Sequence, residues 1–260
     1  MKLKHTYKKY QILVVGCGGT GSALLYFLSR FLFNLDKDVM VTLIDGDTVE
    51  EKNVTRQAFA PADIGENKAK VLANRYMNLL GLKMSYVDRN ISSPDDIYQY
   101  TYPQNLYPIV VGCLDNTLAR SYLNEYFNHA YQLTYLDAGN AETHGQVVMG
   151  VRHWRNTILQ PAGYYFPQLI IPEEPKEQGY VLSCADMGGQ TMSANMLSAH
   201  VLFSYLSNIL SYEEDRYMTL FDSNSMGVFN KPISECVEFN NNVLERSYRF
   251  GHGLDIIEYE

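Results

Sequence analysis

This chain of 260 residues contains few cysteines and no long apolar run. The cysteine spacing includes no Cys-x-x-Cys pair, so it indicates neither a disulfide framework nor a four-cysteine zinc site, and we predict reduced thiols and no zinc. No stretch approaches the roughly 18 consecutive apolar residues of a membrane span, and the first residues lack the apolar core of a signal peptide. We therefore expect a cytoplasmic protein without membrane contact. The cysteines are Cys17, Cys113, Cys184 and Cys236.

Positive charge is also scarce. The sequence has 21 Lys and Arg against 29 Asp and Glu, which gives a net charge of −8. This balance argues against nucleic-acid binding by the whole molecule, and we expect no direct nucleic-acid partner. The exception is the segment 1–9, which holds Lys2, Lys4, Lys8 and Lys9. We interpret it as a solvated leader to the first strand, and contact with an acidic partner is the less favoured alternative.

Short apolar runs alternate with helical patterns through the first half of the chain. This alternation predicts an α/β fold with a mainly parallel sheet. Because ligands of such sheets bind at the carboxyl ends of the strands, we expect Asp45, Asp115 and the turn at 16–21 to share one cleft. Residues 145–151 predict a further strand with an antiparallel partner. The expected parallel strands are 11–15, 39–45, 84–87, 109–111 and 135–138.

The second half of the chain has a different composition. Residues 152–186 are rich in proline and aromatic side chains, which predicts a long crossing loop. Small and apolar residues at 187–210 predict a buried helix, and a hairpin of 217–221 with 227–229 is expected to follow, with little structure in the tail. We predict a single domain, 1–260, made of a nucleotide-binding half (11–150), the crossing loop (152–186) and a C-terminal helix and hairpin (187–260).

A glycine-rich turn follows the first predicted strand. The segment Gly16-Cys17-Gly18-Gly19-Thr20-Gly21 stands between an apolar strand and a helical run. Glycines let the backbone approach a ligand and let the helix pack on the strand, while free N–H groups at the helix start face phosphates. The next strand ends in Asp45, 24 residues after Gly21, where a carboxylate suits a ribose hydroxyl. We interpret this pair as a nucleotide site, and a glycine turn without a nucleotide is the lesser alternative.

A second group of polar residues follows at short intervals. Arg and Lys side chains neutralise charge on a transferred phosphate and on departing pyrophosphate, whereas hydride transfer needs no such cationic pair. Taken singly, Arg56 and Lys68 are equally well explained as surface charges. Together at this spacing they predict a site for a triphosphate under attack. The group comprises Asp45, Asp47, Asn53, Arg56, Gln57 and Lys68.

These motifs resemble those of the ThiF/MoeB family, which includes the adenylating domains of ubiquitin-activating enzymes. Within that family the chain is also similar to the ThiF-related proteins of PRTRC mobile-element systems. The resemblance covers about 11–150 and continues more loosely through Cys184. The motifs that carry it are Gly16-x-Gly18-Gly19-x-Gly21, Asp45-x-Asp47-x-Val49, Asn53-x-x-Arg56-Gln57, Gly65-x-x-Lys68 and Leu114-Asp115-Asn116.

The resemblance implies a fold and an activity. The fold is Rossmann-like, with a mainly parallel sheet, an antiparallel extension and helices on both faces. The activity is ATP- and magnesium-dependent adenylation of the C-terminal carboxylate of a ubiquitin-like or sulfur-carrier protein. No protein base is required, because the attacking carboxylate is already ionised. A homodimer is a further expectation.

The resemblance also implies roles for individual residues. The glycine turn and Asp47 belong to the nucleotide site, and Asp45 holds the ribose. Arg56 and Lys68 contact the phosphates together with Asn53, Gln57 supports them and Asn116 belongs to the same site. Asp115 positions the magnesium ion.

Cys184 stands between the crossing loop and the next predicted helix, where members of this family often carry a reactive cysteine. A helix N-terminus lowers a thiol pKa, which favours capture of the adenylate as a thioester or a part in sulfur transfer. A small buried residue at a helix entry is an equal alternative. Cys17 and Cys113 are predicted to be packing residues.

Two departures from the family pattern limit the resemblance. The chain lacks the paired Cys-x-x-Cys motifs that hold zinc in many members. We also expect no N-terminal helix with an arginine that reaches the ATP of a neighbouring subunit, and Lys2, Lys4, Lys8 or Lys9 is the suggested replacement.

Two other functions are compatible with parts of the sequence. A nicotinamide-dependent oxidoreductase explains Gly16 to Asp45 but leaves Arg56, Lys68 and Asp115 without roles. A catalytically inactive ATP-binding scaffold of a mobile-element system predicts nucleotide binding without turnover. Near the same cleft edge, Asp137 and Asn140 either touch an incoming peptide tail or form a turn.

Overall fold

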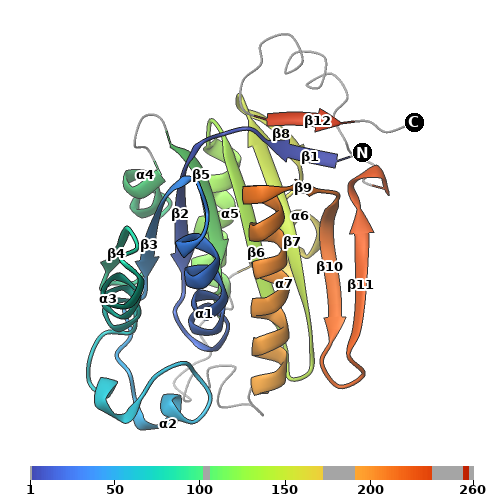
Figure 1. Ribbon diagram of the computed structural model, residues 1–260. Helices are drawn as coiled ribbons and strands as arrows, with labels where there is room; N and C mark the ends of the chain where they lie inside the picture. The colour runs from blue at the N-terminus through green and yellow to red at the C-terminus, as the bar shows by residue number, and fades with distance from the viewer. Residues whose placement is uncertain (1, 102–105, 172–190, 236–253, 258–260) are drawn as a thin grey trace.

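The computed structural model describes residues 2–101, 106–171, 191–235 and 254–257 (Figure 1). Its main sheet has the strand order β11-β10-β7-β6-β5-β2-β3-β4, and β8 pairs with β7. The strands are β2 (Lys9–Val15), β3 (Asp38–Ile44), β4 (Met84–Val87), β5 (Tyr107–Gly112), β6 (Leu133–Asn140), β7 (His144–His153), β8 (Asn156–Leu159), β10 (Arg216–Asp222) and β11 (Gly227–Pro232). The helices are α1 (Gly19–Phe33), α2 (Glu51–Val54), α3 (Lys68–Leu80), α4 (Asp95–Thr101), α5 (Thr117–His129), α6 (Ala162–Tyr165) and α7 (Met192–Ser211), and the short 3-10 turns are Pro61–Asp63, Pro167–Leu169 and Ile233–Glu235.

The parallel part of the main sheet carries the glycine turn. Strands β6, β5, β2, β3 and β4 run parallel to one another. In the central strand β2 every residue after Lys9 is buried, as expected for a strand covered on both faces. β2 ends at Val15, which pairs with Ile44 of β3 and Gly112 of β5. The turn therefore begins at the carboxyl edge of the sheet, as predicted.

The antiparallel part is as large as the parallel part. Among the described strands of the main sheet, four pairings are parallel and four are antiparallel. The prediction of a crossing loop from residue 152 is wrong at its start, because β7 and β8 form a hairpin there. Trp154 (φ 52°) and Arg155 (φ 65°) both have positive φ, as in a type I′ turn, but neither is a residue typical of that turn. The sequence pattern therefore gave no sign of the hairpin.

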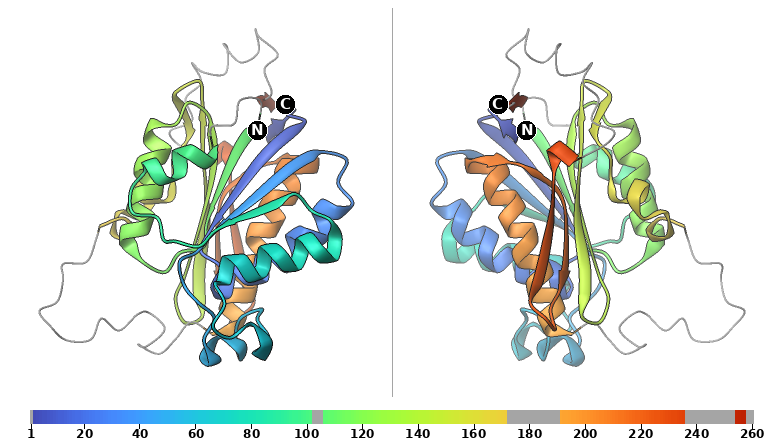
Figure 2. Two further views of the ribbon diagram at one scale, coloured as in Figure 1. Left: turned by 90° about the vertical axis from the view of Figure 1, so that its left-hand side faces the viewer. Right: turned by 90° about the vertical axis from the view of Figure 1, so that its right-hand side faces the viewer.

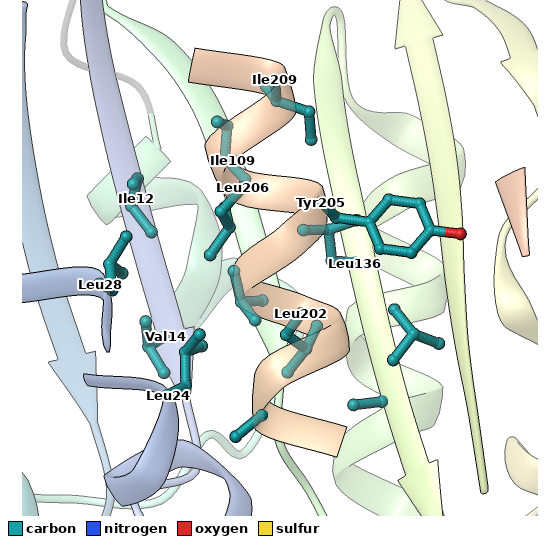
Figure 3. Close-up of a cluster of buried hydrophobic side chains, with 14 of the residues drawn as sticks. Ile12, Val14, Leu24, Leu28, Ile109, Leu136, Leu202, Tyr205, Leu206 and Ile209 are labelled. Carbon is teal, nitrogen blue, oxygen red and sulfur yellow. The ribbon is translucent and has the colours of Figure 1, made fainter. Parts of the chain in front are cut away.

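Helices cover both faces of the main sheet, as the resemblance implies. Figure 2 shows α4 and α5 on one side and α1, α3 and α7 on the other. Successive side chains of β2 point to opposite faces of the sheet, so the strand contributes to both hydrophobic cores. Ile12 and Val14 belong to one core, and Leu13 and Val15 belong to the other. In the larger core, apolar side chains of α7 pack against α1 and the sheet (Figure 3). The labelled members are Ile12, Val14, Leu24, Leu28, Ile109, Leu136, Leu202, Tyr205, Leu206 and Ile209.

A second, three-stranded sheet joins segments from both ends of the chain. It has the order β12-β1-β9, with β1 at Lys2–His5, β9 at Glu213–Glu214 and β12 at Leu254–Ile257. The leader is thus a strand whose Leu3 and His5 are buried, which corrects the prediction of a solvated segment. The tail likewise contains a strand where little structure was expected. These pairings join residues more than 200 positions apart, so no local pattern announces them.

Helix α7 begins at Met192, and Thr191 caps its first turn by accepting a hydrogen bond from the Ala194 N–H at 3.2 Å. One face of the helix is buried, as the small and apolar residues of 187–210 predict: ten of its 20 residues are buried, whereas Met192, Met196 and His200 are exposed. The first residues of the predicted range lie outside the described part of the chain. The expected hairpin is confirmed as β10 with β11. In the part of the chain that the structure describes, no helix combines the length and apolarity needed to span a membrane.

Candidate functional site

A pocket of about 490 Å³ lies at the carboxyl ends of the parallel strands. It gathers residues from the glycine turn, the segment after β3, the start of α3 and the segment after β5. Asp45, Asp115 and the glycine turn thus share one cleft, as predicted. Cys184 lies outside the described residues. The predicted site residues that line the pocket are Gly16, Gly18, Gly19, Asp45, Asp47, Asn53, Arg56, Gln57, Lys68, Asp115 and Asn116.

The glycine turn is closely packed. Gly16 has φ +94°, and a Cβ there would collide with the carbonyl oxygen of Cys113. Gly21 lies inside the first turn of α1, where a Cβ would collide with the carbonyl oxygen of Gly16. Gly18 is the N-cap of α1 and supplies no side-chain cap, so the first N–H groups of this 15-residue helix are left for another acceptor. A helix start of this kind attracts an anion.

Asp45 is held by the backbone of its neighbours. Its Oδ2 accepts a hydrogen bond from the Cys17 N–H at 2.6 Å, and its Oδ1 accepts one from the Asp47 N–H at 2.8 Å. Burial raises the pKa of Asp45, while these hydrogen bonds and nearby Lys68 act in the opposite direction. Each carboxylate oxygen can accept a further hydrogen bond, so the fixed carboxylate suits a pair of hydroxyl donors.

Lys68 is the first residue of α3, and an ion pair with Asp47 holds its ammonium group in place. The Lys68 Nζ lies 2.8 Å from the Asp47 Oδ2, and the side chains are 9% and 61% exposed, respectively. Asn67 caps the same helix and also donates to the carbonyls of Asp45 and Asp47, at 2.7 Å and 3.1 Å. The start of α3 is thereby tied to the segment after β3. An ion pair with one exposed partner adds little stability, so its main effect is to place the lysine.

Asn53, Arg56 and Gln57 come from α2 and the turn after it. Asn53 is 3% exposed, and its Oδ1 accepts a hydrogen bond from the Glu50 N–H at 2.8 Å. The Gln57 Oε1 is buried without a hydrogen-bond partner among the described residues. The half-buried Arg56 lines the pocket, and no described residue forms an ion pair with its guanidinium. Arg56 therefore brings positive charge to the pocket.

The segment after β5 brings Asp115 and Asn116 to the pocket. The Cys113 N–H donates to the Val15 carbonyl at 2.8 Å, which joins this segment to the end of β2. Asp115 is exposed at the pocket. The Asn116 Oδ1 accepts from the Ala119 N–H at 2.7 Å and so caps α5. Asn116 thus stabilises the start of α5, in addition to its predicted contact with a nucleotide.

The cysteines of the described site are poor nucleophiles. Burial raises the pKa of Cys17 well above its usual value, with Asp45 and Cys113 adding to the effect. Burial also raises the pKa of Cys113 to about 12, helped by Asp137. Both thiols are therefore protonated near neutral pH, in agreement with a packing role.

Several residues that line the pocket were missed or misplaced by the sequence analysis. Asn90 follows β4 and accepts a hydrogen bond from the Gly46 N–H at 3.0 Å, and it belongs to no motif. Asn140 lines the pocket, but Asp137 is buried within β6 and forms no turn there. Position at the carboxyl end of a strand was the signal that could have identified Asn90. Further missed residues are Lys52, Ile91, Leu118 and Tyr122.

The four lysines of the segment 1–9 do not line the pocket of their own chain. They lie on β1 or at the beginning of β2 and before it, whereas the pocket is at the other end of β2. The seven residues of that strand separate the two ends by about 20 Å. None of these lysines reaches the pocket of its own chain, and the suggested contact with the ATP of a neighbouring subunit stays a prediction. Lys52 is a third cation at the pocket, and it pairs with Glu50 at 2.9 Å.

Comparison with known proteins gives a family and a set of structural relatives. The ThiF family model matches residues 2–235. The SUMO-activating enzyme subunit uba-2 of Caenorhabditis elegans is 30% identical over 149 residues, which are 55% of this chain and 23% of that protein. The Nedd8-activating enzyme E1 catalytic subunit of Drosophila melanogaster is 32% identical over 123 residues, 47% of this chain and 25% of the relative. The chain thus spans a quarter or less of the length of these relatives.

Solved structures share the fold. Escherichia coli MccB with ATP aligns with a TM-score of 0.62 at 18% identity, over 90% of this chain and 67% of MccB. PaaA aligns with a TM-score of 0.62 at 14% identity, over 87% of this chain and 64% of PaaA. At these identities the likeness establishes the arrangement of the sheet and helices.

Proposed function

The chain belongs to the ThiF family, and on this premise we propose that it adenylates the C-terminal carboxylate of a ubiquitin-like or sulfur-carrier protein with ATP. One observation carries the proposal: a single pocket joins the glycine turn and Asp45 to the cations Arg56 and Lys68. The relatives named as SUMO- and Nedd8-activating enzymes support the same substrate class. A nicotinamide-dependent oxidoreductase leaves the two cations without a task.

The proposed reaction is one displacement at phosphorus. A carboxylate oxygen of the carrier forms a bond to the α-phosphorus, and the bond from that phosphorus to the bridging oxygen breaks and releases pyrophosphate. The start of α1 and Asp45 hold the nucleotide, and Arg56 and Lys68 stabilise negative charge on the phosphates. Since the carboxylate is ionised at neutral pH, the pocket needs no general base.

Asp115 is the residue that we assign to magnesium. In phosphate-transfer sites Mg²⁺ is bound by one or two carboxylates, with phosphate oxygens and water completing its coordination. Asp115 is an exposed carboxylate at the pocket, so it fits such a site. Among the described residues, no three His, Cys, Asp or Glu side chains gather as a self-sufficient metal site. When bound, the ion neutralises charge on the triphosphate.

Thioester formation at Cys184 is the second proposed step. The thiolate attacks the acyl carbon of the adenylate, the carbon–oxygen bond to phosphate breaks, and AMP leaves. Sulfur transfer is the alternative use of the same residue. The homodimer and the membership of a PRTRC system are kept as further proposals.

Carrier-dependent exchange of labelled pyrophosphate into ATP tests the proposed function. We expect exchange with a ubiquitin-like protein from the same genome, provided that its C-terminal carboxylate is free. Exchange should fall by at least about 100-fold in Arg56→Ala, because a charge-stabilising group at the phosphates is removed. Arg89→Ala is the matched control, since Arg89 is 59% exposed and does not line the pocket. ATP binding without exchange for any tested carrier would favour the inactive scaffold.

A further inference from the structure

The buried guanidinium of Arg120 joins two backbone segments of the pocket. Arg120 lies on α5 and is 7% exposed. Its Nη2 donates to the carbonyl oxygens of Leu114 and Ala138, at 2.7 Å each. Leu114 directly precedes Asp115, and both Leu114 and Ala138 line the pocket. One nitrogen therefore connects the segment that carries Asp115 to β6.

The strand register explains why a side chain is needed at this place. β5 and β6 pair last at Gly112 and Asp137, but β6 continues to Asn140. Beyond this last pair, β5 supplies no partner to β6. A buried carbonyl without a donor is costly, and Arg120 provides the donor. Because the guanidinium is planar and rigid, it also fixes the two carbonyls relative to each other.

Asp137 balances the charge of Arg120. The Arg120 Nε lies 3.7 Å from the Asp137 Oδ1, and the two side chains are 8% and 2% exposed. The same Oδ1 accepts a hydrogen bond from the Tyr135 hydroxyl at 3.0 Å. Two buried charges pay a desolvation cost that their attraction often fails to exceed, so such a pair is a weak source of stability. The arrangement therefore favours a role for Arg120 in positioning the two backbone segments that it joins.

We propose that Arg120 is a positioning residue that fixes Asp115 and thereby sets the affinity of the nucleotide-loaded site for magnesium. This inference rests on the proposed function, in which Asp115 holds the ion. Arg120 does not line the pocket and acts through the carbonyl of Leu114. Because Mg²⁺ demands a near-ideal octahedron, a small displacement of its carboxylate ligand weakens binding.

The test is a magnesium titration of ATP binding by calorimetry, with a parallel measurement in EDTA. In Arg120→Met the magnesium concentration for half-saturation should rise about tenfold or more, as is usual when a partner of a metal ligand is lost. ATP affinity in EDTA should stay at the wild-type value. Arg120→Lys keeps the positive charge but loses the planar guanidinium group, so the magnesium concentration for half-saturation should rise less than in Arg120→Met. Tyr135→Phe removes the donor to Asp137 but leaves the Leu114 contact, so it should keep the wild-type magnesium dependence.

The variant Asp115→Asn distinguishes an error in the positioning role of Arg120 from an error in the assignment of magnesium to Asp115. If Asp115→Asn raises the magnesium requirement and the Arg120 variants do not, the positioning role of Arg120 is wrong. If Asp115→Asn also leaves the requirement unchanged, the assignment of magnesium to Asp115 is itself wrong. Thermal unfolding shows which variants are folded. If Arg120→Met does not fold, the magnesium requirement of Arg120→Lys is used as the test.

Discussion

Both oxygens of Asp45 accept backbone hydrogen bonds, from Cys17 in the glycine turn and from Asp47 after β3. The carboxylate therefore connects two strands' carboxyl ends in addition to its proposed contact with ribose. In the sequence, the distance between Asp45 and the glycine turn predicts the contact of Asp45 with a nucleotide. The structural role of Asp45 cannot be predicted in this way. Its hydrogen-bond donor is the backbone N–H of Cys17, and no side-chain pattern indicates that contact.

Asp45→Asn should weaken both the fold and ATP binding. An amide nitrogen would face one of the two N–H donors, so we expect a loss of about 1–3 kcal/mol in unfolding free energy. ATP affinity should fall, because the amide supplies only one acceptor oxygen. Urea unfolding and calorimetric titration measure the two effects, with Asp36→Asn on the exposed surface as the control. Wild-type ATP affinity in Asp45→Asn would contradict the ribose assignment.

His5 should make the protein sensitive to acid. Burial, with Lys37 and His153 nearby, lowers the pKa of His5 from 6.5 to about 3 in the folded state. Between these values the unfolded chain binds a proton that the folded chain does not, so stability falls as the pH falls. The penalty at pH 5 is about 2 kcal/mol.

His5→Phe should remove this part of the pH dependence. The difference in unfolding free energy between pH 7 and pH 5 should shrink by about 2 kcal/mol relative to the wild type. Asn128→Gln changes an exposed side chain that carries no titratable group and should leave the difference unchanged. An equal pH dependence in His5→Phe and the wild type would show that His5 is not the titrating group.

At the scale of elements, the strongest local patterns gave the right structures. The strand before the glycine turn, the helix after it and the hairpin of β10 with β11 follow from apolar periodicity and glycine placement. The hairpin of β7 and β8 was missed, because Trp154 and Arg155 adopt positive φ without the usual turn residues. The caps of α3 and α5 lie in the site, and there Asn67 and Asn116 each combine a structural contact with a place at or beside the pocket.

Gly21→Ala should separate α1 from the end of β2. Its Cβ would collide with the Gly16 carbonyl oxygen, so the helix start must shift. Overpacking of this kind costs about 1–3 kcal/mol, and we expect ATP affinity to fall as well. Gly81→Ala is the comparison, because Gly81 has φ +66° with open space around it. That change should cost about 1–2 kcal/mol of stability from backbone strain alone and preserve ATP affinity. Equal ATP affinities would contradict the phosphate role of the turn.

At the scale of the whole molecule, the site depends on segments far apart in sequence. The predicted motifs from Gly16 to Asn116 converge because parallel strands end at one edge of the sheet. Long-range pairing was the part that could not be predicted: Lys2–His5 pairs with Leu254–Ile257, and neither segment shows a pattern that requires the other. Arg120 was missed for the same reason, because its two carbonyl partners meet only in the folded chain.

The transfer of a carboxylate oxygen to AMP tests adenylation most directly. A carrier protein labelled with ¹⁸O in its C-terminal carboxylate is incubated with this protein, ATP, magnesium and a small thiol, and any released AMP is analysed by mass spectrometry. Attack of the carboxylate on the α-phosphorus, followed by attack of the thiol on the acyl carbon, leaves one carboxylate oxygen on AMP. We predict AMP that carries one ¹⁸O atom. Unlabelled AMP, or release of ADP in its place, would contradict the account.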